Sequence, residues 1–300
     1  FRSDAHKGLG YLFKEGIFNS KKYSSEDKLI YDVTYEINSN GYRVYKTDSQ
    51  SNEGYHKDLS LFGGSFTFGE GLNKEETLPF LLMNNKFILK VDTYALSGWG
   101  VQQALFLLEN NLVRKKSSIN VLLTFPEHSL RSSCKPKYSH NSALYVLKTD
   151  SSLIQNGLCR NKLVTNNFLR VLSKSRLFLG GYNNFYNINT VEEEDLTLYL
   201  ALIKRFIQES KKNGSRALIG VLPTKLTRQV KNIKDIVIDE GGEFIDLQQY
   251  NVNSKTIEDK KFYLHEEDNH PTFYSNKERV IMLIDYIKKD LHREKDKREF

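Results

Sequence analysis

Short apolar runs alternate with stretches of helical periodicity from residue 58 almost to the end of the 300-residue chain. The runs with the length and composition of buried strands lie at 59–62, 87–91, 119–125, 217–222 and 243–247. Amphipathic helical segments lie between or after them, at 101–110, 190–212 and 276–291. This alternation predicts an α/β fold in three α/β/α layers, with a five-stranded parallel sheet of flavodoxin-like type covered by helices on both faces.

The starts of the last two helices carry the spacing of capping boxes. Thr190 is followed three positions later by Glu193, and Ser275 is followed in the same way by Glu278. We therefore expect these helices to begin at those residues. The segment 132–188 fits the alternation poorly, and we expect a hairpin near 143–154 and a helix near 167–175 beside the carboxyl edge of the sheet.

The first part of the chain has a different pattern. Alternating apolar residues at 31, 33, 35 and 37, the turn dipeptide Asn40-Gly41, and renewed alternation at Tyr42 and Val44 predict a hairpin. This segment has too little aliphatic content for its own core. The predicted organisation is a β-rich extension at 1–57, an α/β domain at 58–291 and a charged tail at 292–300.

Composition narrows the function only slightly. The net charge of +7 comes from scattered Lys and Arg, and the densest cluster at 288–300 mixes both signs. This favours a solvated tail, so we expect no nucleic-acid partner. No apolar run is long enough to span a membrane. The sequence begins at Phe1 without a Met, as after loss of a leader or in a trimmed fusion product. The compartment stays open, with an extracytoplasmic one favoured.

The cysteine and metal-ligand patterns are sparse. Cys134 and Cys159 are the only cysteines, and either one disulfide or two buried thiols fits their spacing. No cluster has the spacing of metal ligands, so neither a metal nor a cofactor is expected.

The stretch LSLFGGSFTFGEG, residues 59–71, carries the main chemical signal. It lacks the Lys-Ser/Thr pair of a phosphate-binding loop, the spacing of a dinucleotide fingerprint, and the G-x-S-x-G of a lipase elbow. There remains Ser65 at a strand-to-helix turn. Gly98, in YALSGWG, follows the next strand and could present an N–H group to the same pocket. Near the other end of the chain, Asp268 and His270 have the spacing of an oriented general base.

These blocks resemble those of the SGNH, or GDSL, hydrolase family over roughly 58–291, and GGSFTFGEGLNKEETLP is similar to bacterial members that read GDSFTFGEG. The resemblance implies an SGNH-hydrolase-like fold and a serine esterase. It implies Ser65 as nucleophile, His270 as base and Asp268 as the acid. It also implies an oxyanion hole formed by Ser65, Gly98 and a group in the third block.

The sequence departs from the family pattern at three points. Gly64 replaces the usual Asp, from which we expect a changed loop and not a dead enzyme. His128, in VLLTFPEHSLR, occupies the position of the oxyanion-hole Asn, and it either donates an N–H in its place or is a packing or substrate-contact residue. Glu267 is an alternative to Asp268 as the acid.

The implied activity is hydrolysis of an acyl or acetyl ester on a carbohydrate or lipid. Two alternatives stay open. One is an O-acyltransferase that passes the acyl group to an extracytoplasmic polysaccharide. The other is a non-catalytic glycan-binding module that has kept the fold. The expected partner is thus a small-molecule, glycan or lipid ester.

Overall fold

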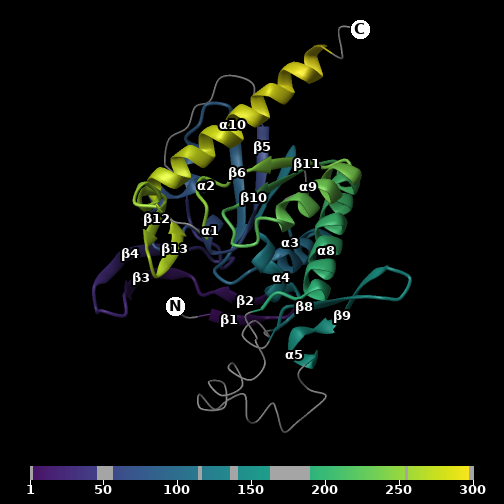
Figure 1. The fold of residues 1–300 in the computed structure, drawn as a ribbon, viewed down its shortest axis with the longest axis horizontal. Coiled ribbons are helices and arrows are strands. Elements are labelled where there is room, and N and C mark those ends of the chain that lie inside the picture. The colour runs from purple at the N-terminus through teal and green to yellow at the C-terminus, as the bar shows by residue number, and fades with distance from the viewer. Residues whose placement is uncertain are drawn as a thin grey trace.

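A parallel sheet of five strands lies at the centre of the computed structural model (Figure 1), which describes residues 3–45, 57–113, 117–135, 141–162, 190–253 and 256–296. The strands are β5 (Lys57–Gly63), β6 (Ile88–Ala95), β7 (Ile119–Thr124), β10 (Arg216–Val221) and β11 (Glu243–Asp246). Their spatial order is β11-β10-β7-β5-β6, which is the 2-1-3-4-5 order of flavodoxin-like folds. All five strand predictions are confirmed.

Helices cover both faces of the sheet, which confirms the three layers. On one face α3 (Val101–Glu109), α8 (Glu193–Lys212) and α9 (Gln229–Asp239) share a hydrophobic core with the sheet. On the other face α2 (Leu78–Met83) and the long α10 (Phe273–Asp296) close a second core. Every residue of β7 is buried, as expected of a strand with helices on both sides.

Both predicted capping boxes are wrong, although the helices exist. The N-cap of α8 is Glu192, whose N–H donates to Asp195 at 3.0 Å, so the box lies two residues beyond the predicted one. Helix α10 begins at Phe273, and the Thr272 hydroxyl accepts from Ser275 N at 3.2 Å. In each case another side chain, that of Asp195 or Thr272, accepts from a backbone N–H at the start of the helix.

The N-terminal extension forms two antiparallel pairs. β1 (Ser3–His6) pairs with β2 (Gly10–Phe13), and β3 (Gly16–Tyr23) pairs with β4 (Leu29–Ile37). The predicted turn at Asn40-Gly41 exists, but the return strand is reduced to a bridge between Ile37 and Arg43. The main partner of β4 is β3, which pairs with it along its whole length. The sequence did not predict β3, because polar residues occupy some of its inward-facing positions and weaken the apolar alternation.

The segment after β7 contains the predicted hairpin, formed by β8 (Ala143–Leu147) and β9 (Leu153–Leu158). A disulfide joins Cys134 to Cys159, which resolves the alternative left open by the sequence. The helix expected at 167–175 lies outside the described residues. Figure 1 shows the hairpin extending away from the sheet, past one end of α8 (Glu193–Lys212).

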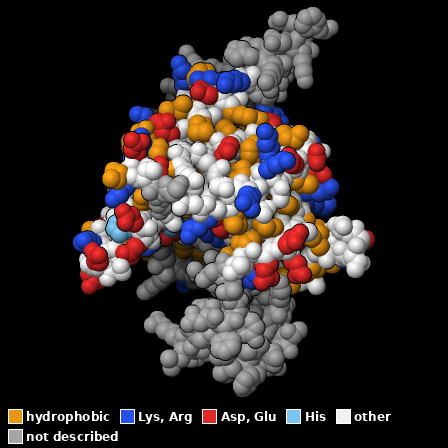
Figure 2. Space-filling model, in the orientation of Figure 1, with side chains coloured by type: hydrophobic (Ala, Val, Ile, Leu, Met, Phe, Trp, Pro, Cys, Tyr) orange, Lys and Arg blue, Asp and Glu red, His pale blue; other side chains and the backbone are white. Residues whose placement is uncertain are grey.

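The surface gives little indication of a charged partner. On the face in Figure 2, Lys and Arg side chains are interspersed with Asp and Glu. Within the described ranges, no helix combines the length and the apolar character that crossing a membrane requires.

Candidate active site

Ser65 is the first residue of α1 (Ser65–Phe68), a single helical turn that follows β5 directly. The turn between strand and helix is tight. A Cβ at Gly63 would lie 2.1 Å from the Thr67 hydroxyl, so only glycine fits there. Ser65 is buried, with 7% of its surface exposed. Its N–H is one of the first-turn donors that a helix leaves without an internal acceptor.

Asp268 and His270 lie on β13 (Asp268–Pro271), which pairs with β12 (Tyr263–His265) just ahead of α10. Asp268 Oδ1 lies 2.5 Å from His270 Nδ1 and also accepts from the His270 backbone N–H at 3.0 Å. The other Asp268 oxygen accepts from Lys22 at 2.8 Å. Burial favours a raised pKa for Asp268, but the hydrogen bonds from His270 and Lys22 outweigh burial and hold that pKa well below its usual range.

Glu267, the alternative acid, faces the N-terminal extension. Its two carboxylate oxygens accept from the backbone N–H and the hydroxyl of Ser25, at 2.8 and 2.7 Å. These bonds lower the pKa of Glu267. Of the two carboxylates, Asp268 is therefore the one that contacts the imidazole.

The serine segment, residues 65–70, meets the histidine hairpin, which is formed by β12 and β13, at the carboxyl edge of the sheet. The rings of Phe66 and His270 lie 5.4 Å apart between centroids. Glu70, at the end of the serine segment, donates its N–H to the Ser65 carbonyl at 3.0 Å, and its Oε2 lies 3.6 Å from His270 Nε2. No direct hydrogen bond joins the Ser65 hydroxyl to His270 in the described structure.

Gly98 occupies a turn at the end of β6, beside the serine segment. The turn is closed by Trp99 N donating to the Leu96 carbonyl at 3.1 Å, and Gly98 has φ +83°. A positive φ at the third position is the mark of a type II turn and favours glycine. The Ser97 hydroxyl donates to Glu70 Oε2, so one carboxylate contacts both this turn and His270.

Arg131 explains why Gly64 stands where the resembled family has Asp. A Cβ at Gly64 would lie 2.7 Å from Arg131 Nη1 and 2.8 Å from the Trp99 carbonyl. Arg131 Nη1 itself donates to that carbonyl at 2.5 Å. The guanidinium therefore takes the space of the missing side chain, and it holds the Gly98 turn against Gly64.

His128 is the last residue of the 3₁₀ turn Pro126–His128, and only 2% of its surface is exposed. Its Nδ1 lies 3.1 Å from the Thr124 hydroxyl, which lies 2.9 Å from the hydroxyl of the fully buried Tyr199. Among the described residues, Tyr199 has Thr124 as its hydrogen-bond partner. The hydroxyls of both Tyr199 and Thr124 have acceptors when Tyr199 donates to Thr124 and Thr124 donates to Nδ1, which leaves the ring proton on Nε2.

The protonation state of His128 follows from its surroundings. Burial lowers the pKa of His128 well below its usual range, and the positive charge of Arg131 lowers it further. The ring is thus a neutral imidazole at neutral pH, with Nε2–H as its donor. A Cβ at Gly64 would lie 3.6 Å from His128 Cε1, so this ring borders the residue before Ser65.

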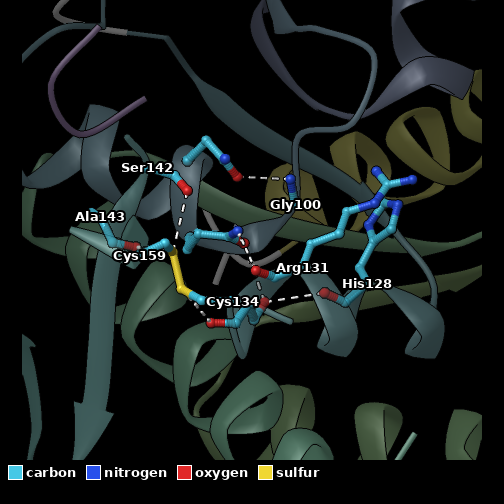
Figure 3. The surroundings of a disulfide bond; sticks show 10 residues. Gly100, His128, Arg131, Cys134, Ser142, Ala143 and Cys159 are labelled. Carbon is cyan, nitrogen blue, oxygen red and sulfur yellow. Dashed lines mark hydrogen bonds between the residues drawn. A yellow bond between two sulfur atoms is a disulfide. The ribbon is translucent and has the colours of Figure 1, made fainter. Parts of the chain in front are cut away.

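Figure 3 shows how the chain holds His128 and Arg131. Both side chains point to the same side of α4 (Ser129–Ser132), away from the disulfide. Cys134 lies two residues after the end of α4 and bonds to Cys159, at the start of α5 (Cys159–Lys162). The disulfide therefore lies beyond the far end of α4, the helix that carries Arg131 and that His128 directly precedes.

The structure adds residues that the sequence did not single out, Lys22, Glu70 and Tyr11. Lys22 and Tyr11 lie in the extension, where no local pattern connects them to the site. Glu70 lies within the GGSFTFGEG stretch itself, and its position after the helical turn could have drawn attention to it. In the described part of the chain, no group of His, Cys, Asp and Glu side chains has a geometry that could hold a metal ion.

No protein-family profile and no curated protein matches the sequence. Among solved structures, a GDSL-like lipase from Bacteroides thetaiotaomicron is 12% identical, with a TM-score of 0.45 over 78% of this chain and 89% of that chain. A catalytic mutant of an acetylxylan esterase from Geobacillus stearothermophilus is 11% identical, with a TM-score of 0.45 over 78% of this chain and 95% of that one. The esterase EstA from a Pseudoalteromonas species is 13% identical, with a TM-score of 0.44 over 79% and 99%. At these values the similarities carry no argument of their own, and the function has to be argued from the residues of this chain.

Proposed function

We propose that the protein is a serine esterase of the SGNH type, which hydrolyses an acyl or acetyl ester on a carbohydrate or lipid. Ser65 is the nucleophile, His270 the general base and Asp268 the residue that orients the imidazole. The observation that carries the proposal is the convergence on Glu70. This residue bonds the Ser65 carbonyl, accepts from the Gly98 turn, and lies 3.6 Å from His270 Nε2. These contacts between three segments that are distant in sequence support the proposal.

The proposed reaction begins with proton transfer. The Asp268 carboxylate accepts from His270 Nδ1–H, which leaves Nε2 as the basic nitrogen. Nε2 takes the proton of the Ser65 hydroxyl while Oγ attacks the ester carbonyl, and the tetrahedral intermediate collapses with loss of the alcohol, which receives that proton. Water, deprotonated by the same nitrogen, then attacks the acyl-enzyme, and the acid leaves as Ser65 Oγ takes that proton back from Nε2.

The oxyanion needs donors that have no other partner. Ser65 N–H and Gly98 N–H donate to no acceptor among the described residues, and we assign both to the oxyanion hole. His128 Nε2–H is the third donor, in the place of the Asn of the resembled family. The neutral state of His128 suits this role, since a neutral imidazole donates without needing a counterion in a buried site.

Hydrolysis of p-nitrophenyl acetate tests the proposal. Ser65→Ala should lower kcat by a factor of about 10³ or more, because it removes the nucleophile and leaves only the oxyanion hole and binding. Asp268→Asn should have a similar effect of about 10³ to 10⁴ through the wrong tautomer of His270. Ser152→Ala, at an exposed turn of the β8–β9 hairpin, is the matched control and should leave kcat unchanged. A Ser65→Ala variant as active as the control would refute the mechanism.

A further inference from the structure

The N-terminal extension reaches the proposed oxyanion hole through one side chain. Tyr11, on β2, donates its hydroxyl to the carbonyl of Ser97. That carbonyl belongs to the peptide that joins Ser97 to Gly98. A Cβ at Gly98 would lie 3.3 Å from the Tyr11 hydroxyl, which places the hydroxyl directly beside the turn.

This hydrogen bond bears on the direction of the Gly98 N–H. The carbonyl and the N–H of a trans peptide point in opposite directions, so a carbonyl held by Tyr11 turns the Gly98 N–H away from Tyr11. The alternative is real, because type I and type II turns differ by a rotation of this central peptide by about 180°. Glycine at the third position tolerates either orientation, so Gly98 does not choose between them by itself.

Among the described residues, the other contacts of the turn involve groups outside this peptide. Ser97 donates to Glu70 through its hydroxyl, and Arg131 donates to the carbonyl of Trp99, two peptides further along. Burial is the main cause that raises the pKa of Tyr11 to about 12. The charge of Arg131 lowers this pKa and the charge of Glu70 raises it, both by less than burial does. The phenol therefore keeps its proton and remains a donor at neutral pH.

We propose that Tyr11 is a positioning residue for catalysis, which holds the Ser97–Gly98 peptide in the orientation that presents the Gly98 N–H to the oxyanion. The inference rests on the proposed function. The extension is then part of the catalytic apparatus, since its hydroxyl sets a donor that another segment supplies. Accepting the Tyr11 bond also polarises the peptide and strengthens the Gly98 N–H as a donor.

The test compares Tyr11→Phe with Tyr145→Phe. Both changes remove one hydroxyl and keep the ring, and the Tyr145 hydroxyl bonds Glu109 at 2.7 Å, away from the site. Tyr11→Phe should lower kcat on p-nitrophenyl acetate by about tenfold to 10²-fold, below the loss of a whole oxyanion donor, with KM within about twofold. Its affinity for a trifluoromethyl ketone, which forms an oxyanion on Ser65, should fall by the same factor. Tyr145→Phe should change neither.

Two controls separate the possible failures. Melting temperatures of both variants establish that each is folded, and a purely structural role of Tyr11 would lower the melting temperature without a matched loss of kcat and ketone affinity. A wild-type protein that a fluorophosphonate labels at Ser65, together with a Tyr11→Phe variant that matches it in kcat, would overturn this inference alone. A wild type that is not labelled at Ser65 would overturn the proposed function and the inference with it.

Discussion

At the scale of single residues, two of the three departures from the family pattern, Gly64 and His128, belong to one arrangement. Gly64 has no room for a side chain because Arg131 and the Trp99 carbonyl fill the space, and His128 borders the same residue. The sequence predicted Ser65, Gly98, Asp268 and His270 as site residues from local motifs. It could not predict the filling of this space by Arg131, because that depends on contacts between segments that are distant in sequence.

The tautomer of His128 leads to a prediction about Tyr199, which touches no substrate in the proposed mechanism. Two hydrogen bonds connect Tyr199 to Thr124 and Thr124 to His128. Tyr199→Phe removes the hydroxyl that donates to Thr124. Thr124 can then accept from His128 Nδ1–H, and the proton is no longer confined to Nε2. We expect ¹⁵N NMR of the imidazole to show Nε2–H in the wild type and a mixture in the variant. The kcat should fall by about tenfold, less than the loss of an entire donor. Pure Nε2–H in both proteins would contradict this account.

At the scale of elements, the sequence predicts the strands and helices that have a strong apolar pattern. It does not predict the residues at which α8 and α10 begin. The five strands of the sheet are buried by helices on both faces, so their sequences are near-continuous apolar runs, and such runs can be recognised in the sequence. Strand β3 was missed because its partly exposed sequence, GIFNSKKY, has a weak apolar alternation. The capping boxes at Thr190 and Ser275 were wrong because other side chains, Asp195 and Thr272, bond the free N–H groups.

Helix α4 leads to a prediction about the disulfide. The bond closes a segment of 25 residues and fixes the end of the helix that carries Arg131. Reduction should lower the free energy of unfolding by about 3 kcal/mol, because the unfolded chain regains the entropy of that loop. It should also lower kcat, since α4 holds His128 and Arg131 in place. Urea denaturation with and without a phosphine reductant measures the first effect.

A double variant controls for effects of the reductant on other groups. Cys134→Ser with Cys159→Ser should unfold at the same urea concentration with and without reductant. Equal midpoints for the wild type in the two conditions would contradict a stabilising role of the bond.

At the scale of the whole molecule, the extension bonds both halves of the proposed site. The Arg43 guanidinium donates to the carbonyls of Phe68, Gly69 and Leu72, just after the serine. Lys22 bonds Asp268 on the histidine hairpin. The sequence predicted that this segment has too little aliphatic content for a core of its own. Its bonds to the site could not be predicted, because isolated polar residues on short strands carry no periodic signal.

Lys22 allows the link between the extension and the hairpin to be measured. Lys22→Met leaves the buried Asp268 without its second donor and should lower the free energy of unfolding by about 1–2 kcal/mol at neutral pH. Lys21→Met is the matched control. Lys21 lies next to Lys22 on β3 but on its exposed side, where it pairs with Asp32 of β4. Loss of this exposed ion pair should leave the free energy of unfolding nearly unchanged.

The effect of Lys22 should depend on pH with a definite sign. Because the pKa of Asp268 is depressed in the folded state, its contribution to stability is present above the unfolded pKa of about 3.9 and is lost as pH falls toward the lower folded value. The difference between wild type and Lys22→Met should therefore shrink below about pH 4. A difference that is constant across this window would show that Lys22 does not act through the Asp268 carboxylate.

The central claim is that Ser65 is a nucleophile activated by His270, and covalent labelling tests it most directly. A fluorophosphonate should add one adduct to the wild type, and peptide mapping should locate the adduct at Ser65. His270→Ala should react far more slowly, and Ser65→Ala should not react at all. A folded wild-type protein that stays unlabelled, or that carries the adduct at another residue, would contradict the account.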